Sequence, residues 1–117
     1  MATLKRPKKF YLEIYDITYL FFIGWDKESY SKYVENKLDY ECKMGPSDEG
    51  ETFFIEEQKT IVIWVKNGKN NLPVLCHEVV HAACFTLHWC GVKPDYKNDE
   101  NLAYLAQILF SKSMSRS

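Results

Sequence analysis

The sequence predicts an α+β fold, in which a short, mostly antiparallel sheet packs on one central helix and two further helices complete the domain. Two regions, 9–24 and 51–66, are rich in β-branched and aromatic residues and indicate strands. The stretch 72–91 is almost uncharged and has the length of a helix. The stretch 27–39 and the region from 98 onwards carry apolar residues at helical spacing.

Size and composition suit one globular domain. The chain has 117 residues, and we expect a single domain over 1–117 with a basic N-terminal arm at 1–8 and a polar C-terminal tail at 111–117. Hydrophobic residues make up 46% and charged residues 26%, a balance typical of globular rather than disordered proteins. The net charge of −1 favours neither a nucleic-acid partner nor an anionic membrane. A solvated arm is favoured over a nucleic-acid contact for its basic residues, Lys5, Arg6, Lys8 and Lys9.

The sequence pattern gives no sign of export or membrane insertion. The N-terminal residues lack the basic, apolar and small-residue succession of a signal peptide. The apolar run 18–25 is too short to cross a bilayer. We therefore expect a cytoplasmic protein with no membrane partner. Its cysteines are then expected to be reduced thiols, and they lack the C-x-x-C spacing of a zinc knuckle; they are Cys42, Cys76, Cys84 and Cys90.

The N-terminal half is expected to contain the strands and the first helix. In the first strand region Asp16 is a point of interruption, and Ile17–Ile23 is expected to continue as a strand buried on both faces. Asp26 suits the N-cap of an amphipathic helix from about Lys27 to Asp39. After a loop at 45–50, the segments 51–55 and 60–66 are expected to pair as a β-hairpin.

The central helix is expected to run over about 72–90, with Pro73 in its first turn and Gly91 closing it. Glu78 is its only charged residue. A helix that is apolar on all sides is normally the buried, central one of its domain. A last helix is expected from about Asn98, with an apolar stripe formed by Leu102, Leu105, Ala106 and Leu109.

The central helix carries an H-E-x-x-H motif, His77-Glu78-Val79-Val80-His81. Residues four apart on a helix differ by about 40° in azimuth and about 6 Å along the axis, so the two imidazoles can converge on one Zn²⁺. Glu78 is turned away from ligation but can reach a water molecule on the metal, as a general base requires. Burying these three polar side chains is unfavourable unless they are paired or metal-bound. The alternative to metal binding is therefore that the two histidines are core residues with hydrogen-bond partners.

A catalytic zinc site also needs a third protein ligand and an open position. Eighteen residues separate His81 from Glu100, and they include the end of the central helix, a turn marked by Gly91 and the start of the last helix. This order brings the first turn of the last helix back towards the motif, and the small side chain of Ala103 allows the helices to approach closely. We therefore expect one Zn²⁺ per chain, bound by His77, His81 and Glu100.

The combination of H-E-x-x-H with a later E-x-x-A, here Glu100 to Ala103, resembles the gluzincin zinc metallopeptidases. The segment 99–105 is more similar still to the ending of small peptidases encoded by bacteriophages, which also have an Ile-Trp-type strand before the metal helix, like Ile63-Trp64. The resemblance is specific over 72–109, and for a phage protein it implies the host cytoplasm. It implies a small zincin-like domain with the zinc ligands His77, His81 and Glu100 and the general base Glu78.

Three further roles stay open at the sequence level. Tyr104 shares a helix face with Glu100 and can donate a hydrogen bond to an oxyanion or to a ligand carboxylate, or it can pack in the core. Asp99 can orient a ligand histidine or complement the helix dipole. A second metal arrangement leaves both glutamates of the motifs unexplained; its ligands are His81, Cys84 and His88.

These features predict a zinc-dependent hydrolase, and the resemblance makes a peptidase the favoured class. A peptide or protein substrate is expected to bind by strand addition to Thr60–Lys66. One alternative is a metal-stabilised viral or host-interaction binding protein without turnover. Another is a zinc hydrolase that acts on a non-peptide bond.

Overall fold

Four strands form one mixed sheet in the computed structural model of the chain, which describes residues 6–41, 49–67, 71–93, 95 and 99–115. The order across the sheet is β1-β2-β4-β3, where the strands are β1 (Lys8–Leu12), β2 (Ile17–Ile23), β3 (Gly50–Ile55) and β4 (Thr60–Val65). The outer pairs β1–β2 and β3–β4 are antiparallel, and the central pair β2–β4 is parallel. The predicted α+β class and mostly antiparallel sheet are therefore confirmed.

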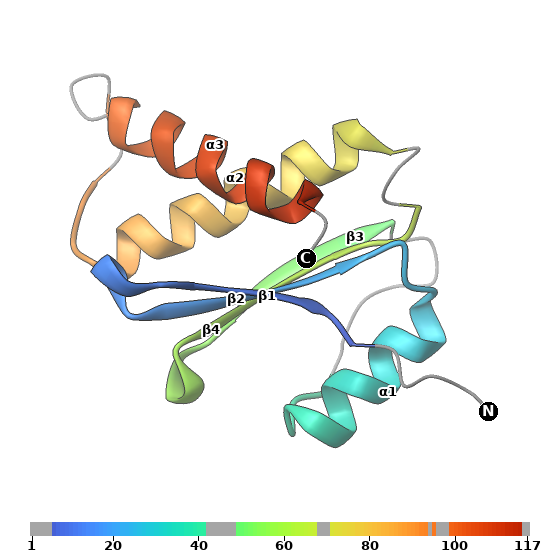
Figure 1. The fold of residues 1–117 in the computed structure, drawn as a ribbon. Coiled ribbons are helices and arrows are strands. Elements are labelled where there is room, and N and C mark those ends of the chain that lie inside the picture. Colours follow the sequence, from blue (N-terminus) through green and yellow to red (C-terminus); the bar gives the residue numbers. More distant parts are fainter. Residues whose placement is uncertain (1–5, 42–48, 68–70, 94, 96–98, 116–117) are drawn as a thin grey trace.

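The helices cover both faces of the sheet, as Figure 1 shows. Helix α1 (Lys27–Lys37) lies on one face, and α2 (Leu72–Trp89) and α3 (Asp99–Met114) lie together on the other. The side chain of Asp26 caps α1 by accepting a hydrogen bond of 2.7 Å from the Ser29 amide, as the sequence predicts. Of the loop expected at 45–50, residues 45–48 lie outside the described part of the chain, and Gly50 already belongs to β3.

Both antiparallel hairpins close through the same kind of turn. A short 3-10 helix is followed by one residue in the left-handed region, Asp16 (φ 55°) after β1 and Lys59 (φ 49°) after β3. The interruption predicted at Asp16 is therefore a complete reversal of the chain, which separates β1 from β2. Parallel pairing of β2 with β4 brings the two turns together, and Lys59 Nζ lies 2.8 Å from Asp16 Oδ2.

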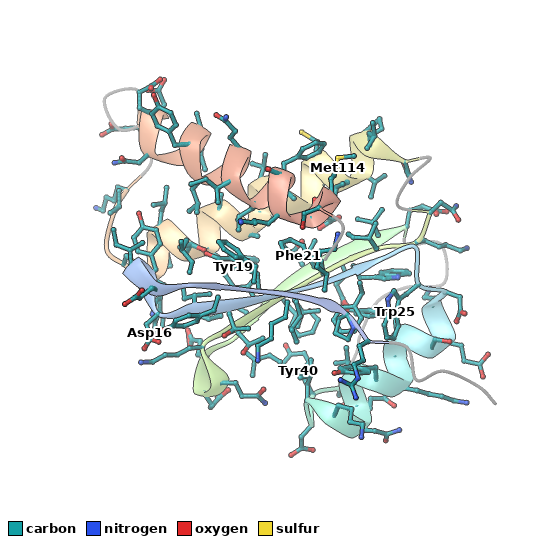
Figure 2. The ribbon with its side chains drawn as sticks, viewed as in Figure 1. Asp16, Tyr19, Phe21, Trp25, Tyr40 and Met114 are labelled. Carbon is teal, nitrogen blue, oxygen red and sulfur yellow. The ribbon has the colours of Figure 1, made fainter. Side chains whose placement is uncertain are left out.

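Two hydrophobic layers hold the sheet between its helices. Alternate side chains of β2 and β4 point towards α2 and α3, and the others point towards α1. Figure 2 shows Tyr19 and Phe21 on the α2–α3 side and Trp25 on the α1 side. Strand β2 is thus buried on both faces as predicted, since Tyr19 and Phe22 are both fully buried although they belong to different layers.

A buried hydrogen bond fixes β2 to α2. The Thr86 hydroxyl donates to the carbonyl oxygen of Ala82 at 2.9 Å, so its oxygen is left to accept from the Tyr19 phenol at 2.6 Å. Burial raises the pKa of Tyr19 to about 12, because the charged phenolate is disfavoured away from water. The phenol therefore stays protonated in the folded protein over a range in which it ionises when the chain unfolds.

We expect Tyr19 to make stability fall at high pH. The raised pKa means that its contribution is complete below about pH 10 and is lost as the pH rises towards about 12, a loss of roughly 2–3 kcal/mol. Near neutral pH, Tyr19→Phe should reduce the free energy of unfolding by about 1 kcal/mol, and the difference from wild type should vanish or reverse near pH 12. Urea unfolding of both proteins between neutral pH and about pH 12 measures this difference in the free energy of unfolding. A difference that stays constant with pH would contradict the raised pKa of Tyr19.

The helices on the α2–α3 side depart from two predictions. Helix α2 is not buried on all sides, since Val80, Phe85 and Trp89 are exposed. Helix α3 continues through Met114, so the polar tail expected from 111 is helical over most of its described residues. Ser113 is buried, and its carbonyl oxygen accepts a hydrogen bond of 3.0 Å from Lys8 Nζ, which ties the end of α3 to β1. Among the described residues, no helix combines the length and apolarity that crossing a bilayer requires.

Candidate metal centre

The two histidines of the H-E-x-x-H motif meet on the exposed face of α2. Their Nε2 atoms are 3.0 Å apart, and their rings lie 4.6 Å apart at 79° to each other. Two nitrogens at this separation can both lie 2.0–2.1 Å from one point, where they subtend an angle of roughly 95°, somewhat below the tetrahedral value. The Nε2 atoms of His77 and His81 are therefore close enough to share one metal ion, and the same contact also has the length of an N–H···N hydrogen bond between the two rings.

Glu78 points to a different side of α2, towards β3. Only 7% of its surface is exposed, and its Oε1 accepts a hydrogen bond of 2.7 Å from the hydroxyl of Thr52. The same hydroxyl lies 3.1 Å from the main-chain carbonyl oxygen of Glu78. This contact supplies a polar partner for the carboxylate, so the burial of Glu78 alone does not require a catalytic explanation.

The close approach of β3 to Glu78 depends on the glycine that begins the strand. A methyl group added at Gly50 would lie 2.9 Å from both the Trp64 carbonyl oxygen and Val74 Cγ1, and 3.1 Å from Glu78 Cγ. The first of these atoms belongs to the main chain of the neighbouring strand and cannot rotate away. To admit any larger residue, β3 would therefore have to shift relative to β4, and the side chains of Val74 and Glu78 on α2 would also have to move.

We expect Gly50→Ala to lower the free energy of unfolding by about 1–3 kcal/mol, the usual range for overpacking. Urea unfolding measures this change. Gly24→Ala is the matched control: nothing lies within 4 Å of the added methyl, so its cost is confined to its positive φ of 81°. A Gly50→Ala protein as stable as wild type would show that the strand and helix are not in tight contact.

The structure does not bring the third predicted ligand to the pair. In Figure 1 α3 crosses α2 near the middle of both helices, and the first turn of α3 lies at the end of α3 that points away from this crossing. Glu100 and its neighbour Asp99 are exposed in that first turn, and Tyr104 is 61% exposed. Within the described residues, no three histidine, cysteine, aspartate or glutamate side chains form a group that could hold a metal ion.

The alternative ligand set, His81, Cys84 and His88, does not form a group that could hold a metal ion either, although all three residues belong to the described part of the chain. Of the four cysteines, Cys42 lies outside the described residues. The others, Cys76, Cys84 and Cys90, are free cysteines in the structure. Burial raises the pKa of the Cys90 thiol, which keeps this group in its protonated form.

An apolar groove runs between α2 and α3 beside the histidine pair. Its volume is about 360 Å³, and Cys76 and Val80, which directly precede the two histidines, form part of its α2 wall. The opposite wall comes from α3 and includes the small side chains of Ala103 and Ala106. The groove and Glu78 therefore lie on opposite sides of the histidine pair around α2.

The strand that was expected to bind a substrate by strand addition has no free edge. Strand β4, which covers almost all of Thr60–Lys66, pairs with β2 on one side and β3 on the other, so neither of its edges is free. The sequence does not reveal that β4 is an inner strand, because its parallel pairing with β2 joins segments about 40 residues apart and such a pairing has no local sequence pattern.

Sequence reasoning also missed the two residues of β3 that surround Glu78. Thr52 and Gly50 carry no motif, and a threonine in a strand is most often just a good strand former. Their importance appears only when β3 is placed against α2. Comparison with protein-family models, with curated proteins and with solved structures finds no match to this chain. These comparisons therefore add nothing to the resemblance to gluzincins that the motif residues suggest.

Proposed function

We propose that the protein is a zinc-dependent hydrolase of the zincin type that acts on peptides. The observation that supports this most is the 3.0 Å separation of the His77 and His81 Nε2 atoms on an exposed helix face. Imidazole nitrogens are favoured ligands of zinc, and their exposure leaves room for water and substrate on the same ion. The proposal assigns one Zn²⁺ per chain.

Glu100 is the third ligand in this proposal. It requires the first turn of α3 to approach the histidine pair when metal binds, because the described residues do not bring three such ligands together in the structure. Three ligands with one open position are the usual set of a catalytic zinc site. Zinc held there would polarise the substrate carbonyl and lower the pKa of water to about 7.

The remaining chemistry belongs to side chains of the protein. Glu78 would accept a proton from the attacking water and deliver it to the leaving amine as a general acid–base group, which requires its carboxylate, buried against β3, to reach the water at the histidine pair. Tyr104 would donate a hydrogen bond to the oxyanion, which again requires the first turns of α3 to approach the pair. The apolar groove beside Val80 offers a surface for an apolar part of the substrate.

A broad peptide library incubated with the zinc-loaded protein and analysed by mass spectrometry tests this function. We expect cleavage at defined sites by the wild-type protein and none after zinc is removed with a chelator. Restored cleavage on adding zinc back would exclude damage by the chelator. Zinc-loaded protein that cleaves no peptide in a broad library would overturn the peptidase assignment.

The second candidate is a metal-stabilised binding protein, for instance a viral protein that binds a host protein without turnover. The exposed ring of Phe85 favours it, because this ring stacks on His81 with centroids 6.3 Å apart and adds an apolar contact surface to the exposed histidine pair. In that case zinc would bind the histidine pair and Glu78 would only pack against β3. Substitution of Glu78 separates the two candidates, because only the hydrolase requires its carboxylate to accept a proton.

A further inference from the structure

We propose that Thr52 is a positioning residue for Glu78 and that its hydroxyl holds the carboxylate in a single orientation. The proposal rests on the proposed role of Glu78 as general base. The carboxylate is the only charged group of α2, and its position relative to the histidine pair decides whether it can serve the reaction.

The contacts around Glu78 hold its side chain at two points. At the carboxylate, the Thr52 hydroxyl donates to Oε1 at 2.7 Å, a distance typical of a charge-assisted bond. Along the stem, β3 approaches so closely at Gly50 that an added methyl would lie 3.1 Å from Cγ. A glutamate on a helix surface normally samples several rotamers, and here both the stem and the head are in contact with the same strand.

The placement of Thr52 is itself fixed by the sheet. Thr52 pairs with Ile63 in the antiparallel ladder between β3 and β4, so its side chain must point to the α2 face. Its hydroxyl also lies 3.1 Å from the Glu78 carbonyl oxygen, so the same group contacts both the main chain and the side chain of Glu78. The strand therefore positions the hydroxyl independently of the carboxylate, as a positioning group requires.

Two substitutions at one position separate the hydroxyl from the rest of the side chain. Thr52→Val keeps the shape and suits a strand, but it cannot donate to Glu78. Thr52→Ser keeps the hydroxyl and loses the methyl group. A role limited to packing would be disturbed more by Ser, whereas a role in positioning would be disturbed by Val and rescued by Ser.

The first measurement uses the metal-free proteins and needs no turnover. Scalar couplings of the Glu78 methylene groups, measured by NMR on isotope-labelled protein, report its rotamer. We expect one rotamer in wild type and in Thr52→Ser, and averaging over several in Thr52→Val. A single unchanged rotamer in Thr52→Val would overturn the positioning role, whatever the protein catalyses.

The second measurement uses the zinc-loaded proteins and a peptide that wild type cleaves. We expect Thr52→Val to lower kcat roughly tenfold to a hundredfold with KM unchanged, and Thr52→Ser to restore it. In a Glu78→Gln background Thr52→Val should cause no further loss, because it acts through the glutamate. An unchanged kcat in Thr52→Val would overturn the proposal and leave the hydrolase standing, whereas absence of cleavage by wild type would defeat the hydrolase and the catalytic part of this proposal together.

Discussion

Alanine in place of His77 or His81 is expected to abolish stoichiometric zinc binding. The two Nε2 atoms converge at 3.0 Å, so each supplies a bond that the other cannot replace. Structural zinc sites with four ligands have binding free energies of about 10–16 kcal/mol, which makes one ligand worth on the order of 3 kcal/mol, or a loss of roughly a hundredfold or more in affinity. Competition titration against a chromophoric chelator measures the affinity, and elemental analysis of the purified proteins measures the occupancy.

His88 supplies the matched control for this experiment. It lies on the same helix and is exposed like the motif histidines, but it takes no part in their contact. His88→Ala should bind zinc as tightly as wild type. Full zinc occupancy in a protein that lacks both His77 and His81 would show that the metal, if it binds, uses other residues.

Glu78→Gln is expected to lower kcat at least roughly a hundredfold while zinc content and stability stay close to wild type. Glutamine has nearly the same shape and keeps an oxygen that can accept the Thr52 hydrogen bond, but it cannot accept a proton from water. Loss of a general base usually reduces the rate by a factor of about 10²–10⁴. Initial rates on a peptide identified from the library give kcat, and thermal unfolding gives the stability.

The exposed Glu57 gives a control for the charge change alone, since Glu57→Gln should leave all three quantities unchanged. Equal cleavage by wild type and Glu78→Gln would point to a contaminating protease. If neither protein cleaves any peptide although both bind zinc, the binding-protein candidate is the better account.

Local signals in the sequence predicted most of the elements of the fold. Asp26 marks the start of α1 as expected, and Gly91, with φ 80°, follows α2 as a helix-closing glycine. The reversal at Asp16 was only anticipated as an interruption, because the left-handed residue that makes the turn is an aspartate rather than a glycine. The Lys59 ammonium group that pairs with Asp16 comes from the other hairpin, so that interaction has no local signature.

The candidate site was predictable as far as one helix determines it. Spacing alone predicts the contact of His77 with His81, because both lie on α2. The relation of Glu100 to that pair depends on how α3 packs, and the partner of Glu78 depends on which strand lies under α2. The apolar composition of α2 predicted a helix buried on all sides, and this prediction was wrong, because Phe85 is exposed.

Anomalous diffraction from a crystal of the zinc-loaded protein, recorded at the zinc absorption edge, tests the metal assignment most directly. The account predicts one zinc per chain at about 2.0–2.1 Å from the Nε2 atoms of His77 and His81, with a Glu100 carboxylate oxygen at about 2.0–2.2 Å. It also predicts that the first turn of α3 lies closer to the histidine pair than in the metal-free protein. Zinc bound by cysteine sulfur at about 2.3 Å, or a zinc site that includes neither motif histidine, would contradict it.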